Sequence, residues 1–360
     1  MSRTVKASKE IKNIRQLSLH DLEDFFINMG EKKFRAKQVW EWLWQKHAAS
    51  FADMTNLSKD LRQKLGESFS LPALTVDTIQ NSADGTVKSR FITHEGHLCE
   101  GVLIPTESRY TACVSSQIGC SLSCKFCATG YIERKRNLEF DEIYDEVVLL
   151  NQQSEKTYGK KLSNIVFMGM GEPLLNYRNV MKAVERITAE DGLAMSPRRI
   201  TVSTAGVAKG IRQLGDDKVR FKLALSLHAA NDAKRNEIMP INETNNLKAL
   251  IDALNHFYKE TKNEITLEYI LFNNFNDSTK DADDLIKVYR QVPADLVNII
   301  EYNPIDFAKF EKPSDEKMES FLAYLTKHKV NARLRRSRGK DIDAACGQLA
   351  NKATTATAVS

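Results

Sequence analysis

The sequence has 360 residues, of which 42% are hydrophobic and 28% charged, a composition typical of a globular protein with more than one small core. No apolar run approaches the roughly 18 residues that span a membrane, and no apolar stretch follows the charged start, which argues against a membrane segment and a signal peptide. The net charge of +5 permits a polyanionic partner without requiring one, and we expect a cytoplasmic protein whose six cysteines are reduced and serve a metal or catalysis.

Residues 1–95 are predicted to form a separate helical module. Apolar residues at helical spacing predict helices over 19–29 and 34–46, and a third through 57–65. The tryptophans of the second helix are expected to pack in the core of this module. Four basic residues beside them form either a solvated face or a face for nucleic acid: Lys32, Lys33, Arg35 and Lys37.

The rest of the chain is predicted to be a larger α/β domain over 96–349. Short alternating runs around a turn at Asp84-Gly85 predict strands that lead into it. Strands are then predicted at 111–116, 163–168, 199–204, 221–227, 265–272, 296–302 and 329–334, with helices near 139–153, 176–190, 205–214, 246–261, 279–291 and 315–328. Such alternation predicts a parallel sheet, and six or seven units fall short of the eight of a closed barrel. We therefore expect an open, partial (β/α) barrel with its functional residues at the C-terminal ends of the strands.

Three cysteines in one tight loop, Cys120, Cys124 and Cys127, are the strongest chemical signal in the sequence. Their spacing allows all three sulfurs to reach one metal centre. A structural zinc site needs a fourth ligand, which Cys113 or Cys99 could supply. With no fourth ligand, three thiolates on a four-iron cluster leave one iron open to a small molecule. The spacing alone leaves both alternatives open.

Polar residues also follow several of the predicted strands. Glu172, in the sequence Gly169-Met-Gly171-Glu172-Pro173, can pair with an ammonium group, and the glycines allow backbone to approach a ligand closely. Other strand ends carry Ser203, Ser226, His228 and Asn303. Each residue could be a simple turn former, but together they form a consistent ring at one edge of the sheet.

The C-terminal part of the chain is strongly basic. Four arginines and a lysine between 333 and 340 are either a solvated face or contacts to phosphate, with Arg335 and Arg336 as the central pair. Cys346 follows them and would by itself be an incidental thiol. The residues 350–360 are rich in Ala and Thr and are predicted to form a disordered tail.

The cysteine loop resembles that of the radical S-adenosylmethionine (SAM) enzymes, in which it holds a 4Fe-4S cluster with one iron open to SAM. The sequences around Cys113, Arg136-Asn-Leu138, Met239-Pro-Ile-Asn242 and Cys346 further resemble the radical SAM methyltransferases that act on adenine C2 of 23S ribosomal RNA. This resemblance extends from Phe34 to Gln348. It implies the radical SAM core fold, the cluster on the three loop cysteines, and S-adenosyl-L-methionine contacts at Gly171, Glu172, Ser203, Ser226, Leu227, His228 and Asn303.

The resemblance also implies a mechanism. Adenine C2 is electron-poor, so it cannot attack the methyl group of SAM directly, whereas a carbon radical can add to it. In the family, the residue matching Cys346 accepts a methyl group that becomes the radical and joins the RNA to the protein. Cys113 then releases the product by forming a Cys113–Cys346 disulfide. Glu100 matches the presumed base for the C2 proton. Expected partners are 23S rRNA, tRNA as a second substrate, and an electron donor such as flavodoxin, for a monomeric enzyme without a membrane.

Two other functions are compatible with parts of the sequence. The related enzymes that methylate adenine C8 share the cysteine loop and the Cys346 region, but they typically have alanine where this chain has Pro173, which favours C2. A non-catalytic, zinc-stabilised RNA-binding protein would use Cys113 as a fourth zinc ligand and would have no need of Cys346.

Overall fold

The structure is a computed structural model that describes residues 11–352. It divides into two compact units. One comprises the chain up to Leu74 together with Glu185–Met195, and the other comprises the remainder. No helix within residues 11–352 is both long and apolar enough to cross a membrane.

The first unit is the predicted helical module. Its helices are α1 (Leu19–Asn28), α2 (Phe34–Trp44) and α3 (Lys59–Ser68), with 3-10 turns at Ile14–Gln16 and Phe51–Asp53. α1 begins where predicted because Ser18 and Asp21 form a capping box, in which the Ser18 hydroxyl accepts from the Asp21 N–H at 3.1 Å. The core consists of buried side chains from all three helices, including Leu22, Phe26, Val39, Leu43, Leu61 and Leu65.

The tryptophans of α2 tie the segment Glu185–Met195 into this unit. Trp44 is only 1% exposed, which confirms its predicted place in the core, whereas Trp40 and Trp42 are only partly buried. The Trp40 indole N–H donates to Asp191 at 2.7 Å, and the Arg186 guanidinium lies 5.0 Å from the Trp40 ring centroid and 5.6 Å from that of Trp44. A cation over two aromatic faces, together with the indole bond, fixes this segment on α2.

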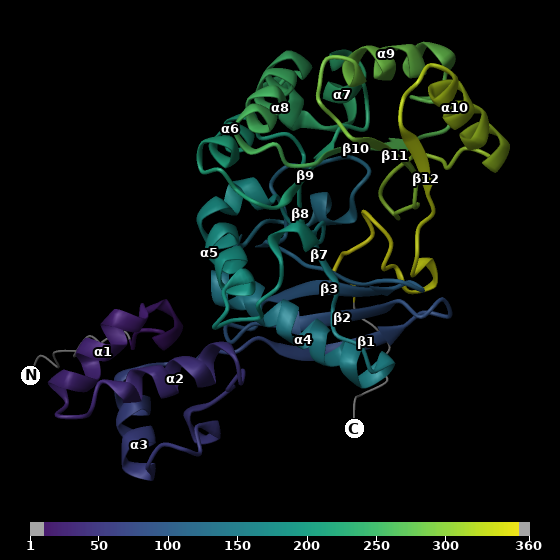
Figure 1. Ribbon diagram of the computed structural model, residues 1–360. Coiled ribbons are helices and arrows are strands. Elements are labelled where there is room, and N and C mark those ends of the chain that lie inside the picture. Colours follow the sequence, from purple (N-terminus) through teal and green to yellow (C-terminus); the bar gives the residue numbers. More distant parts are fainter. Residues whose placement is uncertain (1–10, 353–360) are drawn as a thin grey trace, which may run out of the picture. The chain divides into compact units, whose positions relative to one another are not determined.

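The second unit is built on one ten-stranded sheet (Figure 1). In spatial order its strands are β1 (Thr75–Asn81), β2 (Val87–Ile92), β3 (Leu98–Pro105), β4 (Tyr110–Cys113), β7 (Asn164–Phe167), β8 (Ile200–Thr204), β9 (Lys222–Ser226), β10 (Ile265–Leu271), β11 (Leu296–Glu301) and β12 (Ala332–Arg335). The strands from β1 to β4 pair antiparallel, and those from β4 to β12 pair parallel. β1 and β12 lie at the two edges, so the sheet is not closed into a barrel, as predicted.

The helices of this unit connect the parallel strands. They are α4 (Phe140–Tyr158), α5 (Tyr177–Thr188), α6 (Ala208–Asp216), α7 (Asp232–Ile238), α8 (Leu247–Thr261), α9 (Thr279–Tyr289) and α10 (Asp315–Lys327), of which α5 ends in the first unit. A two-stranded sheet of β5 (Gln117–Ile118) and β6 (Arg136–Asn137) flanks the cysteine loop. The predicted alternation is confirmed, whereas α7, β5 and β6 were not predicted.

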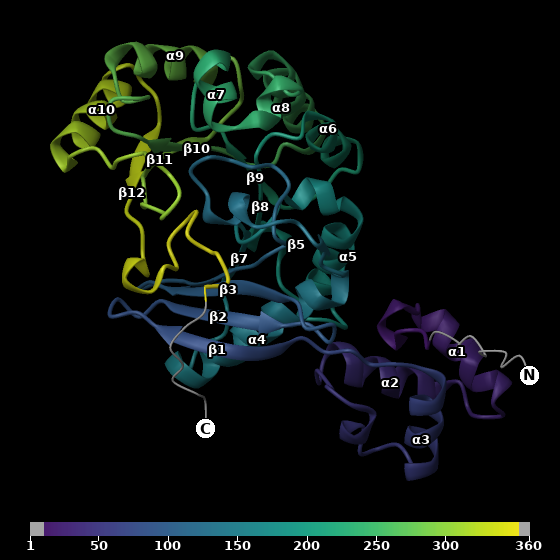
Figure 2. The ribbon, with the colours of Figure 1, turned by 180° about the vertical axis from the view of Figure 1, so that it is seen from behind.

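Two boundaries differ from the predictions. The units divide after Leu74 instead of at residue 95, because the β1–β2 hairpin is hydrogen-bonded to β3 and continues the main sheet. The chain is also held in place up to Lys352, whose carbonyl accepts from Arg90 at 2.8 Å, so the predicted disordered tail does not begin at 350. Residues 353–360 of that tail lie outside the described residues. Figures 1 and 2 show the C-terminal stretch (yellow) returning from β12 to the side of β3.

A buried arginine on α7 joins the loops that follow β8 and β9. Arg235 is 0% exposed, and its guanidinium donates to the carbonyl oxygens of Ala205 at 2.6 Å, Ser226 at 3.2 Å and Leu227 at 3.1 Å. It also donates to the Asn242 side chain at 2.6 Å. Burial lowers the pKa of Arg235 to about 10, so it remains charged at neutral pH. This one side chain therefore fixes the strand ends at which the site forms.

Replacing Arg235 with Met should destabilise the protein, because it leaves buried carbonyl groups without their donor. We expect a loss of about 3 kcal/mol in the free energy of unfolding. Urea unfolding should be followed by circular dichroism, since all three tryptophans lie in the first unit. The control is Arg290→Met on the exposed end of α9, which should change stability by less than about 0.5 kcal/mol. Equal effects of the two changes would contradict the proposed role of Arg235.

Candidate active site

The strand ends predicted to carry the site do share one edge of the sheet. Cys113 ends β4, Ser226 ends β9 and Glu301 ends β11. Because these strands run parallel, their C-terminal ends and the loops that follow them meet at the same edge. The cysteine loop, defined here as residues 120–129, follows β4 and β5 and reaches this edge too.

The three thiols of the cysteine loop lie close enough to interact. Burial raises the pKa of all three, and Cys127 raises the pKa of both Cys120 and Cys124 further. The loop closes tightly, because a Cβ on Gly130 would lie 2.8 Å from the Cys124 carbonyl oxygen. Three thiolates held together in a partly buried place require positive charge beside them, and a metal centre would supply it.

The two other buried cysteines do not complete a zinc site in this loop. The Cys99 sulfur lies 3.7 Å from a carboxylate oxygen of Glu146, and Cys113 interacts with Cys346. Within residues 11–352, no three His, Cys, Asp or Glu side chains, the loop cysteines included, stand in the arrangement that holds a single ion. Tetrahedral zinc needs four ligands at about 2.0–2.3 Å from one centre, and the contacts of Cys99 and Cys113 lie with other groups. Three soft thiolates with no fourth ligand fit an iron–sulfur cluster better.

Phe126 holds the cysteine loop against the body of the sheet. Its ring is 7% exposed and packs in an apolar cluster with Ile238, Phe272 and Tyr302. The same ring meets His228 edge to face, with centroids 4.9 Å apart. Because Phe126 stands between Cys124 and Cys127, this packing sets the position of both sulfurs.

Cys113 and Cys346, which are far apart in the sequence, come together in the structure. Burial and then the nearby Cys346 raise the pKa of Cys113 to about 12, while Arg335 acts in the opposite direction. The pKa of Arg335 is raised, chiefly by Cys346. All six cysteines are free, so the structure contains no disulfide. The two thiols named from the resemblance are therefore neighbours that share one guanidinium.

Cys346 is held in place by backbone bonds to the cysteine loop. We call residues 344–352 the C-terminal segment. The Gly347 carbonyl accepts from the Ala128 N–H at 2.7 Å, and the Leu349 carbonyl accepts from the Thr129 hydroxyl at 2.7 Å. The Cys346 carbonyl itself accepts from the Asn303 amide at 3.2 Å. These bonds place Cys346 next to the candidate metal site.

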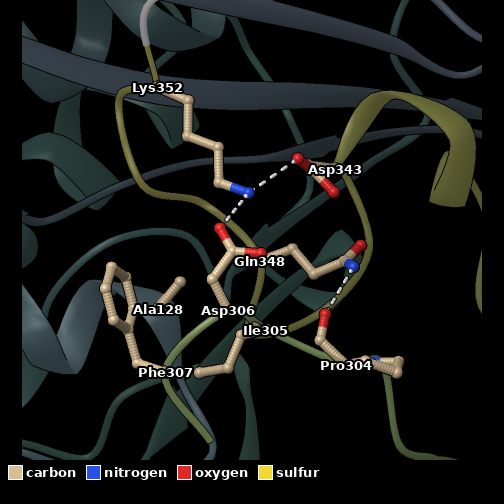
Figure 3. Close-up of a pocket in the computed structure, with 8 residues that line it drawn as sticks. All are labelled: Ala128, Pro304, Ile305, Asp306, Phe307, Asp343, Gln348 and Lys352. Carbon is tan, nitrogen blue, oxygen red and sulfur yellow. Dashed lines mark hydrogen bonds and ion pairs between the residues drawn. The ribbon is translucent and has the colours of Figure 1, made fainter.

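A small hollow separates the C-terminal segment from the loop that follows β11 (Figure 3). Gln348 crosses it and donates to the Pro304 carbonyl at 3.1 Å. The Lys352 ammonium lies 3.0 Å from Asp306 and 3.1 Å from Asp343, so it joins the two sides. The hollow is lined by Ala128, Pro304, Ile305, Asp306, Phe307, Asp343, Gln348 and Lys352.

Glu100 anchors the end of the same segment. It is 2% exposed on β3, and its Oε2 accepts from the N–H groups of Ala350 at 2.9 Å and Asn351 at 3.1 Å. Its Oε1 lies 3.7 Å from the ammonium of Lys88, which is buried as well. The structure thus places Glu100 beside the C-terminal segment, with both carboxylate oxygens engaged.

Glu172 offers a buried carboxylate to a cation. Its oxygens accept from the N–H groups of Leu174 at 3.0 Å and Ala205 at 2.7 Å. Burial raises the pKa of Glu172 to about 6 in spite of these bonds. An ammonium group bound here would offset the cost of burying the charge. The preceding Gly171 has a φ of +92°, and a Cβ there would lie 2.5 Å from the Gln117 side chain, so only glycine fits.

The remaining predicted SAM contacts lie on the following strands. The hydroxyls of Ser203 and Ser226 are 3.4 Å apart across β8 and β9, and Leu227 is fully buried. Burial and then Arg235 lower the pKa of His228 to about 3, so this imidazole is neutral. Its Nδ1 accepts from a backbone N–H at 3.1 Å, which leaves the proton on Nε2.

The residues of the basic run at the C-terminal end contact different protein groups. Arg335 faces the two cysteines and lies 3.6 Å from Glu268. Arg336 points the other way and is paired with Asp315 at 2.6 Å. The others are also engaged by protein groups: Arg333 with Asn298, Arg338 with the Asp84 carbonyl, and Lys340 with Glu301.

Two residues of the site were missed in the sequence. Arg235 holds the strand-end loops, and Lys88 pairs with Glu100. Arg235 stands four residues before the Met239-Pro-Ile-Asn242 phrase and bonds to Asn242, so that phrase could have pointed to it. Lys88 lies on β2, and the sequence does not indicate that β2 pairs with β3, so the contact between Lys88 and Glu100 could not be predicted.

Comparisons with known proteins agree with this geometry. Residues 12–71 match the ribosomal RNA large subunit methyltransferase N-terminal domain, and residues 114–286 match the radical SAM superfamily. A probable dual-specificity RNA methyltransferase RlmN from Cytophaga hutchinsonii is 57% identical, over 96% of this chain and 95% of that protein. The dual-specificity RNA methyltransferase RlmN from Geotalea uraniireducens is 42% identical, over 94% of this chain and 96% of that protein.

A solved structure shares the fold over almost the whole chain. The crystal structure of a radical SAM methyltransferase from Sphaerobacter thermophilus superposes with a TM-score of 0.88 at 38% identity, covering 94% of this chain and 99% of that one. Identity at this level over nearly full length, with a matching N-terminal module and core, shows common family membership. The chain belongs to the RlmN family of dual-specificity RNA methyltransferases, within the radical SAM superfamily.

Proposed function

We propose that this protein methylates C2 of an adenine in 23S rRNA, and of an adenine in tRNA, by way of a methyl group carried on Cys346. The observation that carries the proposal is the meeting of Cys113 and Cys346 beside the cysteine loop. The relatives named as dual-specificity RNA methyltransferases support the choice of substrates. The relatives give no support to the C8-methylating alternative, which shares these cysteines, or to the zinc-stabilised binding protein.

The cofactor residues are assigned as follows. Cys120, Cys124 and Cys127 would hold a 4Fe-4S cluster, and Glu172 would receive the ammonium group of SAM. Further SAM contacts are assigned to Gly171, Ser203, Ser226, Leu227, His228 and Asn303. When bound, the cluster and SAM supply a methyl group and the carbon radical that activates it. An external electron donor, such as flavodoxin, would complete the system.

The steps performed by the chain's own residues use the two thiols in turn. The Cys346 sulfur takes up the methyl group, which would then lose one hydrogen atom to the carbon radical that bound SAM supplies. The remaining methylene carbon adds to adenine C2 and links the RNA to the protein, and this adduct gives up the C2 proton to a base and one electron to a one-electron acceptor, a role that the oxidised cluster could fill. The Cys113 thiolate then attacks the Cys346 sulfur. A sulfur–sulfur bond forms and the sulfur–carbon bond breaks, with its electron pair passing to the carbon, which takes a proton and becomes the methyl group. The two cysteines end the cycle joined as a disulfide, and an external reductant must reduce this disulfide before the next cycle.

Local charge decides when these thiols can react. The pKa of about 12 keeps Cys113 protonated in the resting protein, so it does not attack prematurely. Arg335 is the positive charge that favours both thiolates. We assign Glu100 as the base that takes the proton from adenine C2. Its carboxylate can accept this proton only after residues 350–352 have moved away from it.

The first test concerns the metal ligands. Replacing Cys120, Cys124 or Cys127 with Ala should remove iron from the anaerobically purified protein and abolish the cleavage of SAM to 5′-deoxyadenosine. Iron content and 5′-deoxyadenosine should be measured on the same samples. Cys99→Ala is the matched control, because Cys99 is a buried cysteine away from the loop. A loop variant that still cleaves SAM would rule out the ligand assignment.

The two remaining cysteines should fail in different ways. Cys346→Ala has no sulfur to carry the methyl group, so it should yield neither product nor a protein–RNA link. Cys113→Ala should form the link and be unable to release it, because it lacks the attacking thiolate. The link should appear as a nuclease-sensitive shift on a denaturing gel. Normal turnover by Cys113→Ala, or the same behaviour of both variants, would disprove the two-cysteine mechanism.

The affinity for SAM should depend on pH through Glu172. The carboxylate must be charged to bind an ammonium group, and its pKa of about 6 means that the charge is present above pH 6 and is lost as the pH falls below it. In the cluster-loaded protein, equilibrium dialysis should therefore show SAM binding about tenfold weaker at pH 5 than at pH 7. Glu172→Gln should bind weakly throughout this range with a flat profile. A wild-type profile equally flat would contradict the assignment.

A further inference from the structure

Two large aromatic side chains stand exposed beside each other near the site. Tyr131 is 47% exposed and Phe307 is 62% exposed, the highest value for any large hydrophobic side chain within residues 11–352. Their ring centroids lie 5.2 Å apart, with an angle of 30° between the planes. Exposing a phenylalanine ring to water costs free energy, so a pair kept on the surface calls for a ligand.

Both rings are attached to parts of the site already described. Tyr131 ends the 3-10 turn Ala128–Tyr131 that follows Cys127, and its hydroxyl donates to the Lys125 carbonyl at 3.1 Å. Phe307 lies in the loop after β11 and lines the hollow of Figure 3 together with Gln348. A ligand on this pair would therefore sit next to the C-terminal segment that carries Cys346.

The charges around the rings suit an anionic ligand. Lys125 and Lys309, one in each of the two loops, are exposed. Two carboxylates of the same loops are paired with lysines, Asp306 with Lys352 at 3.0 Å and Glu133 with Lys135, while Glu311 accepts from the Asn273 amide. The two rings are thus flanked by positive charge, as is typical of places where a nucleic acid backbone passes.

We propose that Tyr131 and Phe307 form an aromatic platform on which an RNA base next to the target adenine stacks. This inference rests on the proposed function, since an adenine whose C2 is to react must leave its stack and so deprives its neighbour of a stacking partner. A flat π-face restores that partner for any base, without reading its identity. A docking protein would need about 800 Å² of contact on each side, for which an isolated ring pair offers little.

The test measures RNA binding by the full-length, cluster-loaded protein. The probe is a fluorescent stem–loop from 23S rRNA that contains the target adenine, and binding is followed by anisotropy. Phe307→Ala should weaken binding about tenfold, whereas Phe307→Trp, which keeps a π-face, should bind like the wild type. Val76→Ala is the control, because it removes an exposed apolar side chain from β1. Circular dichroism and iron content should match the wild type in every variant, and Tyr131→Leu provides a second variant should Phe307→Ala fail this check.

A mutant cycle with the RNA identifies the occupant of the platform. An abasic nucleotide is placed on either side of the target adenine in turn. At one of the two positions, the abasic nucleotide should weaken binding to the wild-type protein about as much as Phe307→Ala does. Phe307→Ala combined with that abasic RNA should lose less than about a further twofold in affinity. Undiminished binding by Phe307→Ala, or losses that multiply at both positions, would overturn the proposal.

Two further outcomes can be distinguished from these. A variant that binds RNA normally, and is slow only with a protein electron donor and not with dithionite, would assign the rings to the donor and overturn the platform. If the wild-type protein forms no C2-methyladenine, the proposed function fails, and the binding cycle still decides whether the rings hold a base.

Discussion

The pairing between the C-terminal segment and the cysteine loop is the constraint on which the site depends. Cys346 lies in a stretch without helix or strand, so the bonds from Ala128 to Gly347 and from Thr129 to Leu349 decide where its sulfur stands. Both bonds join backbone carbonyls to the loop that carries the three metal-binding candidates. The thiol to which we assign the methyl group and the candidate metal site are consequently joined by these bonds, so that a shift of either displaces the other.

The same segment links the two roles of Glu100. Two N–H donors and the Lys88 ammonium occupy its two carboxylate oxygens. Its availability to a proton therefore depends on the departure of residues 350–352. An RNA that displaced these residues would free the base, and the anchor of the chain end beyond Cys346 would be lost at the same moment. In this arrangement Glu100 cannot both hold the segment and accept the proton.

The fold after residue 111 could be predicted because its central parallel strands, β10 and β11 above all, are buried along nearly their whole length and read as largely apolar runs. The division near residue 75 could not. The β1–β2 hairpin has the same alternating pattern whether it closes a helical module or extends a sheet, and only its bonds to β3 decide between them. α7 was missed because seven residues, Asp232–Ile238, are too few to show a helical period. The role of its buried residue Arg235 could not be recognised in the sequence, because it consists of bonds to loops from two other strands.

The basic run explains why residues of a site cannot be assigned by proximity along the chain. Side chains of a strand alternate between its two faces, so neighbours such as Arg335 and Arg336 serve different surroundings. Arg335 turns inward to Cys113 and Cys346, where its charge favours thiolates, and Arg336 turns outward to Asp315. Charge that acts on the thiols is not available to phosphate. Attraction of the RNA backbone near the site can then come from the cations that stay exposed, among them Lys125 and Lys309 beside the aromatic platform.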